Sequence, residues 1–456
     1  MKIKKAIRNL NFFEHCGITI SMQFRSTNSH DPQVSFKDVV LHCLPPDGGL
    51  YVPSKAMDLR QLFLYMDEQT TYHELVAAVA PSLLQGELNP FSAARVAESA
   101  FDFEPELKQL DENYSLLTLY NGPTGNYKDF GIGFLAAVLE ELLKSKRQAM
   151  ILSSARGNSG ISLGRAFQGR RGLTSVMLYP SGPIRGLDSA GFVPNGGNII
   201  PIQIRGTLDD CQRLRNEILN DQTFAQRYNI TSANAINLAR LLPQAFYYLY
   251  AFVKLKKRLS GDLVFSVPSG NFGNLISGLY AWKFGLPASG FIAAMNANNA
   301  FGDFILGKKF EPRPVLATNS PALDVGSPSN YARLCSFYDE APAVMRNMVF
   351  PASIDDDKTI KTMEQAWKQY GVLLDPHGAV AFAAARDFAQ SDKLPGAHIV
   401  VLDTGHPAKE AGLVEAATGQ RVPLPENLAE LKKEANPIAL IDPYLDVVES
   451  VIASCF

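Results

Sequence analysis

The sequence predicts an α/β protein with open, mainly parallel twisted sheets flanked by helices, together with a smaller N-terminal module. A short apolar run that ends in a Gly/Ser/Asn turn and opens onto a helical stretch recurs along the chain. The first hundred residues lack that pattern and are mostly helical. The chain has 456 residues, too many for one hydrophobic core, which favours two or three domains.

The N-terminal part divides into an extension and a module. Glu14 and His15 interrupt the apolar run that a signal peptide requires, so we expect residues 1–21 to be an extension before Met22. Whether this extension belongs to the mature protein is left open by the sequence. Residues 22–112 combine helical segments such as ELVAAVAPSLL with the extended piece GGLYVPSKAMDL. We expect them to form a separate module.

Beyond this module, apolar strands alternate with helices. Four segments share the pattern: AMILSSARGNSGISLGRAFQG from Ala149, TSVMLYPSGPIRGLDSAG from Thr174, DLVFSVPSGNFGNLISGLYAWKFG from Asp262 and HIVVLDTGHPAKEAGLVEAA from His398. Such alternation implies a parallel sheet covered on both faces, with ligands beyond the carboxyl ends of its strands. We therefore expect the four turns to converge on one cleft. The stretch 319–352, rich in Pro, Ser and Asn, is expected to be irregular.

Bulk properties exclude several classes of protein. The formal net charge is −2, so the chain as a whole offers no basic surface, and we expect no nucleic-acid or membrane partner. No apolar run reaches the roughly 18 residues of a membrane span. The five cysteines are scattered and no Cys/His cluster appears, so we expect reduced thiols, no metal site and a cytoplasmic location.

Two loops rich in small residues are suited to anions. In VPSGNFGN, residues 267–274, a strand ends and a helix begins, so backbone N–H groups and the helix N-terminus can hold a phosphate. A tight turn without a ligand is the alternative. In SARGNSG, residues 154–160, N–H groups can hold a carboxylate and Arg156 can pair with an anion. The alternative for Arg156 is a solvated loop arginine.

Lys128 stands where the turn GPTGNY opens onto the apolar stretch KDFGIGFLAAVLEELL. Burial lowers the pKa of a lysine and makes its amine a better nucleophile, whereas a surface lysine paired with Asp129 is the alternative. Combined with the two anion-type loops, such a lysine suggests pyridoxal 5'-phosphate, which needs an amine, a phosphate cradle and a partner for its ring nitrogen. Thr404 in LDTGHPAK is the candidate partner, and a hydroxyl there favours elimination and replacement chemistry.

Ordered motifs along nearly the whole chain from about Phe24 resemble the threonine synthase family of fold type II pyridoxal-phosphate enzymes. They include RSTN, GGLYVP, GPTxxxKDF, TSANAINLARLLPQAFYYLYA, VPSGNFGNLISGLYA, DVGSPSN, LLDPHGAVA and HPAK. The resemblance implies fold type II architecture with two open sheets. It also implies that residues 113–456 form two α/β subdomains with the active site between them.

The resemblance assigns roles to individual residues. Lys128 would form the Schiff base and move protons on the substrate carbons, and Thr404 would meet the pyridine nitrogen. Asn158 would lie near the phenolic oxygen of the cofactor, and Arg240 at the anion end of the substrate. The cofactor phosphate would be held by Ser269, Gly270, Asn271, Phe272 and Gly273.

The loop before Lys128 departs from the family pattern. The family usually reads HGPTLAFKDF, whereas this chain reads NGPTGNYKDF. Gly125 and Asn126 would then open space and add an amide beside the substrate.

The other substrate loops depart as well, while the cofactor loops keep their pattern. SSARGNSG stands where the family has ATSGDTG, which places Ser154, Arg156 and Ser159 near the substrate. After the next strand, Pro183 replaces a lysine of the family, and Arg185 is gained. Such changes alter the volume and geometry of an anion site.

These departures favour a pyridoxal-phosphate lyase of the family that acts by elimination or replacement on a Cγ- or Cβ-activated amino acid other than O-phosphohomoserine. An ordinary threonine synthase, which converts O-phosphohomoserine and water to threonine and phosphate, is the alternative. A non-catalytic paralogue that binds an amino acid or anion is a second alternative. The sequence leaves open the substrate, the fate of the intermediate, and whether the protein is a monomer or a homodimer.

Overall fold

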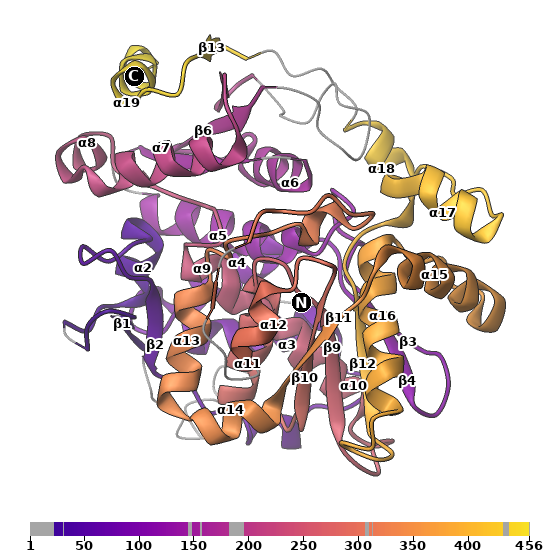
Figure 1. Cartoon of the computed structure of the whole chain (residues 1–456). Coiled ribbons are helices and arrows are strands. Elements are labelled where there is room, and N and C mark those ends of the chain that lie inside the picture. Colours follow the sequence, from indigo (N-terminus) through magenta and orange to yellow (C-terminus); the bar gives the residue numbers. More distant parts are fainter. Residues whose placement is uncertain are drawn as a thin grey trace.

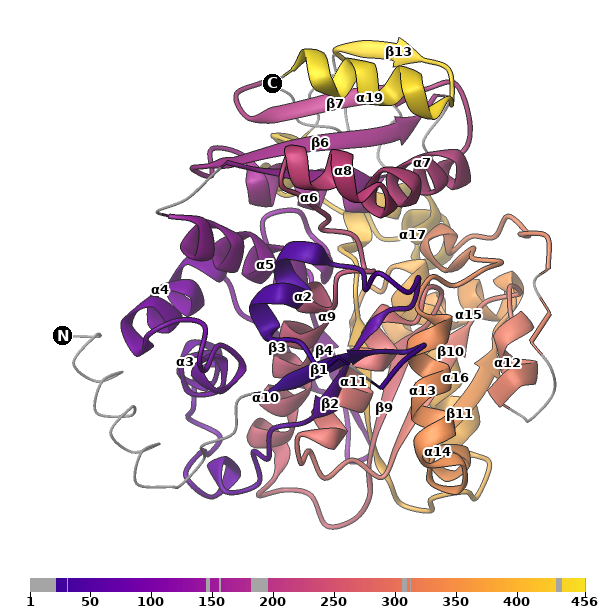
Figure 2. The ribbon, with the colours of Figure 1, turned by 90° about the vertical axis from the view of Figure 1, so that its left-hand side faces the viewer.

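The protein is described here by a computed structural model that contains two large sheets (Figure 1). The described residues are 22–30, 32–144, 148–155, 157–181, 196–305, 310–311, 313–431 and 437–455. Figure 2 shows the smaller sheet above the larger one, with α5 below the smaller sheet. The predicted α/β class with two mainly parallel sheets and flanking helices is confirmed.

The larger sheet has six strands in the order β11-β10-β9-β12-β4-β3. Neighbouring strands are parallel except β3 and β4, which are antiparallel. β3 lies before the expected module boundary at residue 112 and nevertheless joins this sheet. The strand bounds are β3 Glu106–Gln109, β4 Tyr114–Thr118, β9 Leu263–Pro268, β10 Gly290–Met295, β11 Val349–Ser353 and β12 His398–Asp403.

The smaller sheet has five parallel strands in the order β13-β7-β6-β5-β8. Helices α7 and α19 pack on one of its faces through a core that includes Leu152, Leu214 and Ile452. The strand bounds are β5 Ala149–Ser154, β6 Leu173–Pro180, β7 Ile199–Ile204, β8 Ile230–Thr231 and β13 Ala439–Ile441.

The helices cover both sheets. The longer ones are α3 Tyr72–Leu83, α4 Pro90–Ala100, α5 Lys128–Leu143, α6 Asn158–Phe167, α7 Leu208–Asn220, α10 Ala245–Leu255, α11 Gly273–Lys283, α13 Tyr331–Glu340, α15 Asp356–Tyr370, α16 Pro376–Ala389, α17 Ala411–Thr418 and α19 Leu445–Ser454. The shorter ones are α2 Phe36–His42, η1 Leu62–Leu64, α8 Gln222–Arg227, α9 Leu238–Leu241, η2 Leu242–Gln244, α12 Ala300–Ile305, η3 Pro321–Leu323, α14 Pro342–Met348, η4 Pro407–Glu410 and α18 Glu426–Ala429.

The N-terminal module packs against α5 and α10 without a separate core. Its strands β1 Gln23–Ser26 and β2 Tyr51–Lys55 pair antiparallel. Tyr72 of α3, Phe130 of α5 and Tyr250 of α10 are buried in one hydrophobic cluster, with ring centroids 5.5 and 5.6 Å from that of Tyr72. Burial of this shared apolar surface stabilises the position of α5.

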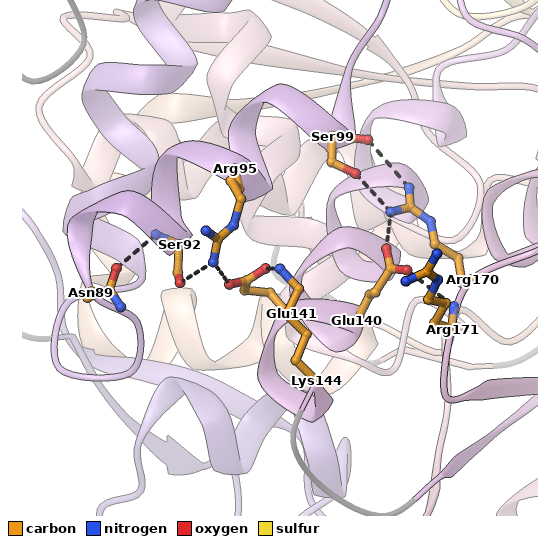
Figure 3. A network of polar contacts seen from close by, with 9 residues as sticks. All are labelled: Asn89, Ser92, Arg95, Ser99, Glu140, Glu141, Lys144, Arg170 and Arg171. Carbon is orange, nitrogen blue, oxygen red and sulfur yellow. Dashed lines mark hydrogen bonds and ion pairs between the residues drawn. The ribbon is translucent and has the colours of Figure 1, made fainter. Parts of the chain in front are cut away.

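Ion pairs fix the far end of α5 (Figure 3). Glu141 accepts a hydrogen bond of 2.5 Å from Arg95 of α4 and a second one from Lys144. Glu140 accepts a bond of 2.7 Å from Arg170, which follows α6 and also bonds Ser99. The helix that begins with Lys128 is therefore held to the N-terminal module and to the smaller-sheet subdomain.

One further expectation is decided by the fold. The segment 319–352, expected to be irregular, contains α13 and α14, so that expectation was wrong. Both helices bury one apolar face, including Leu334 and Met345, against the main core, and this tertiary packing outweighs the local composition. Among the described residues no helix is long and apolar enough to cross a membrane. In the same residues no group of acidic, His or Cys side chains is arranged to hold a metal ion.

Candidate active site

The loops after β4 and β12 meet at the carboxyl ends of these neighbouring parallel strands. The backbone N–H of Tyr127 donates to the carbonyl of Thr404 at 3.0 Å, and that of His406 donates to the carbonyl of Gly125 at 3.0 Å. Asn126 and Gly405 form an antiparallel bridge between these bonds. The structure thus brings Lys128 and Thr404, which are 276 positions apart in the numbering, to one edge of the sheet.

Lys128 is the first residue of α5, and its amine is poised for chemistry. Burial and the nearby charges of Arg240 and Lys409 lower its pKa to about 7. Its Nζ lies 5.0 Å from the ring centroid of Tyr127 and has no hydrogen-bond acceptor among the described residues. An amine that is half neutral near pH 7 can attack an aldehyde and can exchange protons at that pH.

The turn before Lys128 is built on a buried carboxylate. The backbone N–H and the hydroxyl of Thr124 donate to Asp129 at 2.8 and 2.5 Å. The amide nitrogen of Asn126 donates to the hydroxyl oxygens of Thr124 at 2.7 Å and Ser162 at 3.0 Å, and its oxygen accepts the backbone N–H of Lys128 at 3.0 Å. Asp129 is thus a support of the turn, and the amide of Asn126 is engaged with its own loop and α6.

Gly125 does not open space in the site. Its φ is +62°, and a Cβ built on it would lie 2.9 and 3.0 Å from the two Cδ atoms of Leu428 and 3.3 Å from Cβ of His406. Leu428 of α18 is completely buried and occupies that volume. The expectation that Gly125 widens the pocket is therefore wrong, because an apolar side chain from the C-terminal segment fills the gap.

The expected phosphate loop connects β9 to α11. A Cβ on Gly270 would lie 2.8 Å from Cα of Leu323, so that only glycine fits there. Asn271 bonds the N–H of Ser329 at 2.5 Å and its hydroxyl at 2.8 Å, which fixes the loop from outside. Phe272 has a left-handed φ of 58° and directs the chain into α11, where the N–H groups of the first turn lack intrahelical acceptors.

Asn274 is a residue of this loop that the sequence interpretation did not single out. Its oxygen accepts hydroxyl hydrogens from Tyr247 at 2.6 Å and Tyr248 at 2.8 Å. Its amide nitrogen is buried and has no acceptor among the described residues. Because the two tyrosines fix the amide, the free donor is oriented for an acceptor that the chain itself does not provide.

Asp403 is the last residue of β12, and Thr404 follows it. Thr404 is 8% exposed, and its hydroxyl has no hydrogen-bond partner among the described residues, which leaves it free to meet a ligand. Both carboxylate oxygens of Asp403 are buried without partners, and burial together with the charge of Asp375 raises its pKa well above the usual range. Burial without a partner therefore disfavours the charged form of Asp403.

The loop after β5 is fixed from two sides. The hydroxyl of Ser154 accepts a bond of 2.7 Å from Arg215, and Asn234 bonds the backbone N–H and carbonyl of Ser154 at 2.9 and 2.7 Å. Asn158 and Ser159 lie in the first turn of α6 and are partly buried. The side-chain amide oxygen Oδ1 of Asn158 accepts a bond of 2.8 Å from Lys409. Ser154 is thus engaged in holding the loop, and the N-terminus of α6 faces the remaining site groups.

Arg240 is 5% exposed and acts on Lys128 through its charge. It donates to the carbonyl of Ala233 at 2.8 Å, while its Nε is buried without an acceptor among the described residues. Burial lowers its pKa to about 10. A buried guanidinium with an unused donor is suited to an anionic group of the substrate. Arg156 and Arg185, the other expected anion ligands, lie outside the described residues.

Both histidines in the family motifs have local structural bonds. His377 accepts the N–H of Ala322 at 3.1 Å through Nε2, which leaves Nδ1 as the donor to Asp375 at 2.6 Å. His406 accepts the N–H of Ala408 at 3.1 Å. These bonds indicate that the two histidines fix loops.

The residues present fit pyridoxal phosphate. The buried amine of Lys128 matches the aldehyde of the cofactor. The unpartnered amide donor of Asn274, at the end of the phosphate loop, matches the phosphate. The unpartnered hydroxyl of Thr404 matches the ring nitrogen. Gly270 lets the phosphate loop pack closely against Leu323, where a side chain would clash, and so fixes the position of the loop. The fold and the site together define a pyridoxal-phosphate-dependent enzyme of fold type II.

Comparisons with known proteins give the family. Residues 105–405 match the model of pyridoxal-phosphate dependent enzymes, residues 23–101 that of the threonine synthase N terminus, and residues 378–452 that of the threonine synthase C-terminal region. Threonine synthases of Serratia marcescens and Escherichia coli are each 34% identical, over 90% of this chain and 94% of theirs. The chain belongs to the threonine synthase family and is a pyridoxal-phosphate-dependent carbon–oxygen lyase of that kind.

Solved structures agree. Threonine synthase from Escherichia coli is similar with a TM-score of 0.84 and 30% identity, covering 95% of this chain and 100% of that one. Pyridoxal-phosphate-bound threonine synthase from Brucella melitensis is similar with a TM-score of 0.83 and 29% identity, covering 95% and 99% of the two chains. These comparisons favour ordinary threonine synthase activity over an altered substrate.

Proposed function

We propose that the protein is an ordinary threonine synthase, which converts O-phosphohomoserine and water to threonine and phosphate. One observation supports this choice over the altered-substrate hypothesis. Leu428 fills the volume next to Gly125 and the amide of Asn126 is engaged within its loop, so these two changes ahead of Lys128 need no new substrate to explain them. Similarity to threonine synthases over nine-tenths of the chain supports the same conclusion.

When bound, pyridoxal phosphate supplies an electron sink that stabilises negative charge on the substrate carbons. In this proposal the amine of Lys128, with its pKa lowered to about 7, removes and returns protons at these carbons as phosphate leaves Cγ and water adds at Cβ. Atoms balance, since one water is consumed and one phosphate is released for each threonine.

The remaining residues bind and orient. The phosphate loop, residues 269–273, and the amide of Asn274 would hold the cofactor phosphate, and Thr404 would hold the ring nitrogen. Arg240 would bind an anionic group of the substrate through its unused Nε. We retain Ser159, Arg156 and Arg185 as proposed substrate contacts.

The test is a substrate panel. Loaded enzyme is incubated with O-phosphohomoserine and, in parallel, with homoserine esters whose activating group is an acyl chain, and threonine is measured by chromatography. We expect threonine from O-phosphohomoserine at a kcat/KM at least a hundredfold above that for the esters. Turnover of an acyl ester in preference to the phosphate ester would contradict the proposal, and would restore the altered-substrate hypothesis.

A further inference from the structure

Lys409 is a second buried lysine of the site. It lies in η4, six residues after the end of β12, and is 7% exposed. Its ammonium donates to the side-chain amide oxygen Oδ1 of Asn158 at 2.8 Å, its one hydrogen bond to the described residues. Because η4 follows the larger sheet and α6 covers the smaller one, this bond joins the two subdomains across the site.

The bond determines which way the amide of Asn158 faces. An ammonium group only donates, so the atom of Asn158 that it contacts is the oxygen. The amide nitrogen of Asn158 then faces away from Lys409 and has no acceptor among the described residues. A donor with a fixed orientation is thus presented at the N-terminus of α6.

The charge of Lys409 also reaches Lys128. Groups acting on Lys128 are Arg240 from α9, Lys409 from η4, Asp129 from α5 and Asp375 ahead of α16. Arg240 and Lys409 lower the pKa of Lys128, whereas the two aspartates raise it.

The charge of Lys409 has no close counter-ion. Lys409 itself is influenced by Asp129, Asp375 and Glu410, but none of these is within ion-pair distance, and burial lowers its own pKa to about 8. Its acceptor Asn158 is neutral, so the ammonium charge is not cancelled where it is held.

We propose that Lys409 is a positioning residue of the cofactor site, which holds the Asn158 amide with its nitrogen toward the cofactor ring oxygen. This role rests on the proposed placement of the cofactor over Lys128.

Three variants test this orienting role. Lys409→Arg keeps the charge, Lys409→Gln keeps an N–H donor without the charge, and Lys409→Met removes both. Lys254→Met is the matched control, since Lys254 also donates to one neutral oxygen, the carbonyl of Glu68 at 2.7 Å, and is not among the groups that act on Lys128.

The orienting role is tested on loaded protein by its absorbance spectrum across pH. The ratio of the visible band to the near-ultraviolet band reports the protonation and hydrogen bonding of the cofactor ring oxygen. We expect Lys409→Met to change this ratio at a given pH, Lys409→Gln to change it less, and the Lys254→Met control to match the unmodified protein. Identical spectra in all variants would overturn the orienting role. This measurement uses no substrate, so it remains decisive if threonine formation fails.

Discussion

Gly125→Ala tests the packing of Leu428 beside Gly125, which supports an ordinary threonine synthase over an enzyme with an altered substrate. The residue has a φ of +62°, a conformation that costs an alanine about 1 kcal/mol. The added methyl would lie 2.9 Å from Leu428, and such overlap costs about 1–2 kcal/mol more. Destabilisation of the loop by about 2–3 kcal/mol is therefore expected.

The assay is hydrogen exchange of cofactor-free protein, followed by mass spectrometry of the peptide that spans residues 122–130. In this peptide the N–H of Tyr127 is bonded to Thr404 and that of Phe130 to Tyr127. Exchange should accelerate at least tenfold in Gly125→Ala, because about 1.4 kcal/mol of opening free energy corresponds to a factor of ten.

The same change in a Leu428→Ala background is the control. There the overlap disappears and only the backbone cost remains, so the cost of Gly125→Ala should fall by about 1–2 kcal/mol. An equal cost in both backgrounds would show that Leu428 does not fill the space beside Gly125. The packing beside Gly125 would then no longer support the ordinary threonine synthase proposal.

Three further outcomes are expected. In cofactor-free protein, acetylation of Lys128 should have its midpoint near pH 7, because burial and nearby cations lower the pKa of its amine. An ordinary lysine is only about one part in 2,500 neutral at that pH. A midpoint above pH 9 would contradict this lowered pKa. Asn274→Ala should weaken pyridoxal-phosphate binding about tenfold in a fluorescence titration, whereas unchanged affinity would mean that the free amide meets no ligand. Burial raises the pKa of Glu141, but its bonds to Arg95 and Lys144 outweigh this and lower it to about 2. Glu141→Gln should therefore cost about 1 kcal/mol at pH 7 in thermal unfolding, and the difference should vanish as the pH falls from about 4.5 toward 2; a pH-independent difference would exclude the ion pair as its cause.

The positions of the site groups were predictable where one local motif carries them. Lys128 at a turn-to-helix junction, the glycine-rich loop after β9 and Thr404 at the end of β12 each follow from small residues at a strand end. The parallel sheets follow from the alternation of strands and helices. Local sequence was sufficient to place these groups, because the strand or helix next to each group determines its position.

Contacts between distant segments were not predictable in this way. Leu428 meets Gly125 across about 300 positions, and nothing near Gly125 indicates that its space is filled. The bond between Lys409 and Asn158 likewise spans 251 positions, although Lys409 lies in a recognised motif. Asn126 was expected beside the substrate because its loop was expected there. The orientation of its side-chain amide depends on a hydrogen bond to Ser162 of α6, which nothing near Asn126 in the sequence indicates.

The central claim is that this chain releases phosphate from Cγ and adds water at Cβ, with Lys128 moving the protons. The direct measurement is turnover of O-phosphohomoserine in water enriched in heavy oxygen, with mass analysis of both products. The account predicts equal amounts of threonine and phosphate, label in the threonine hydroxyl and none in the phosphate, and no turnover by folded Lys128→Ala protein. Keto acid and ammonia in place of threonine, label in the phosphate, or turnover without Lys128 would contradict it.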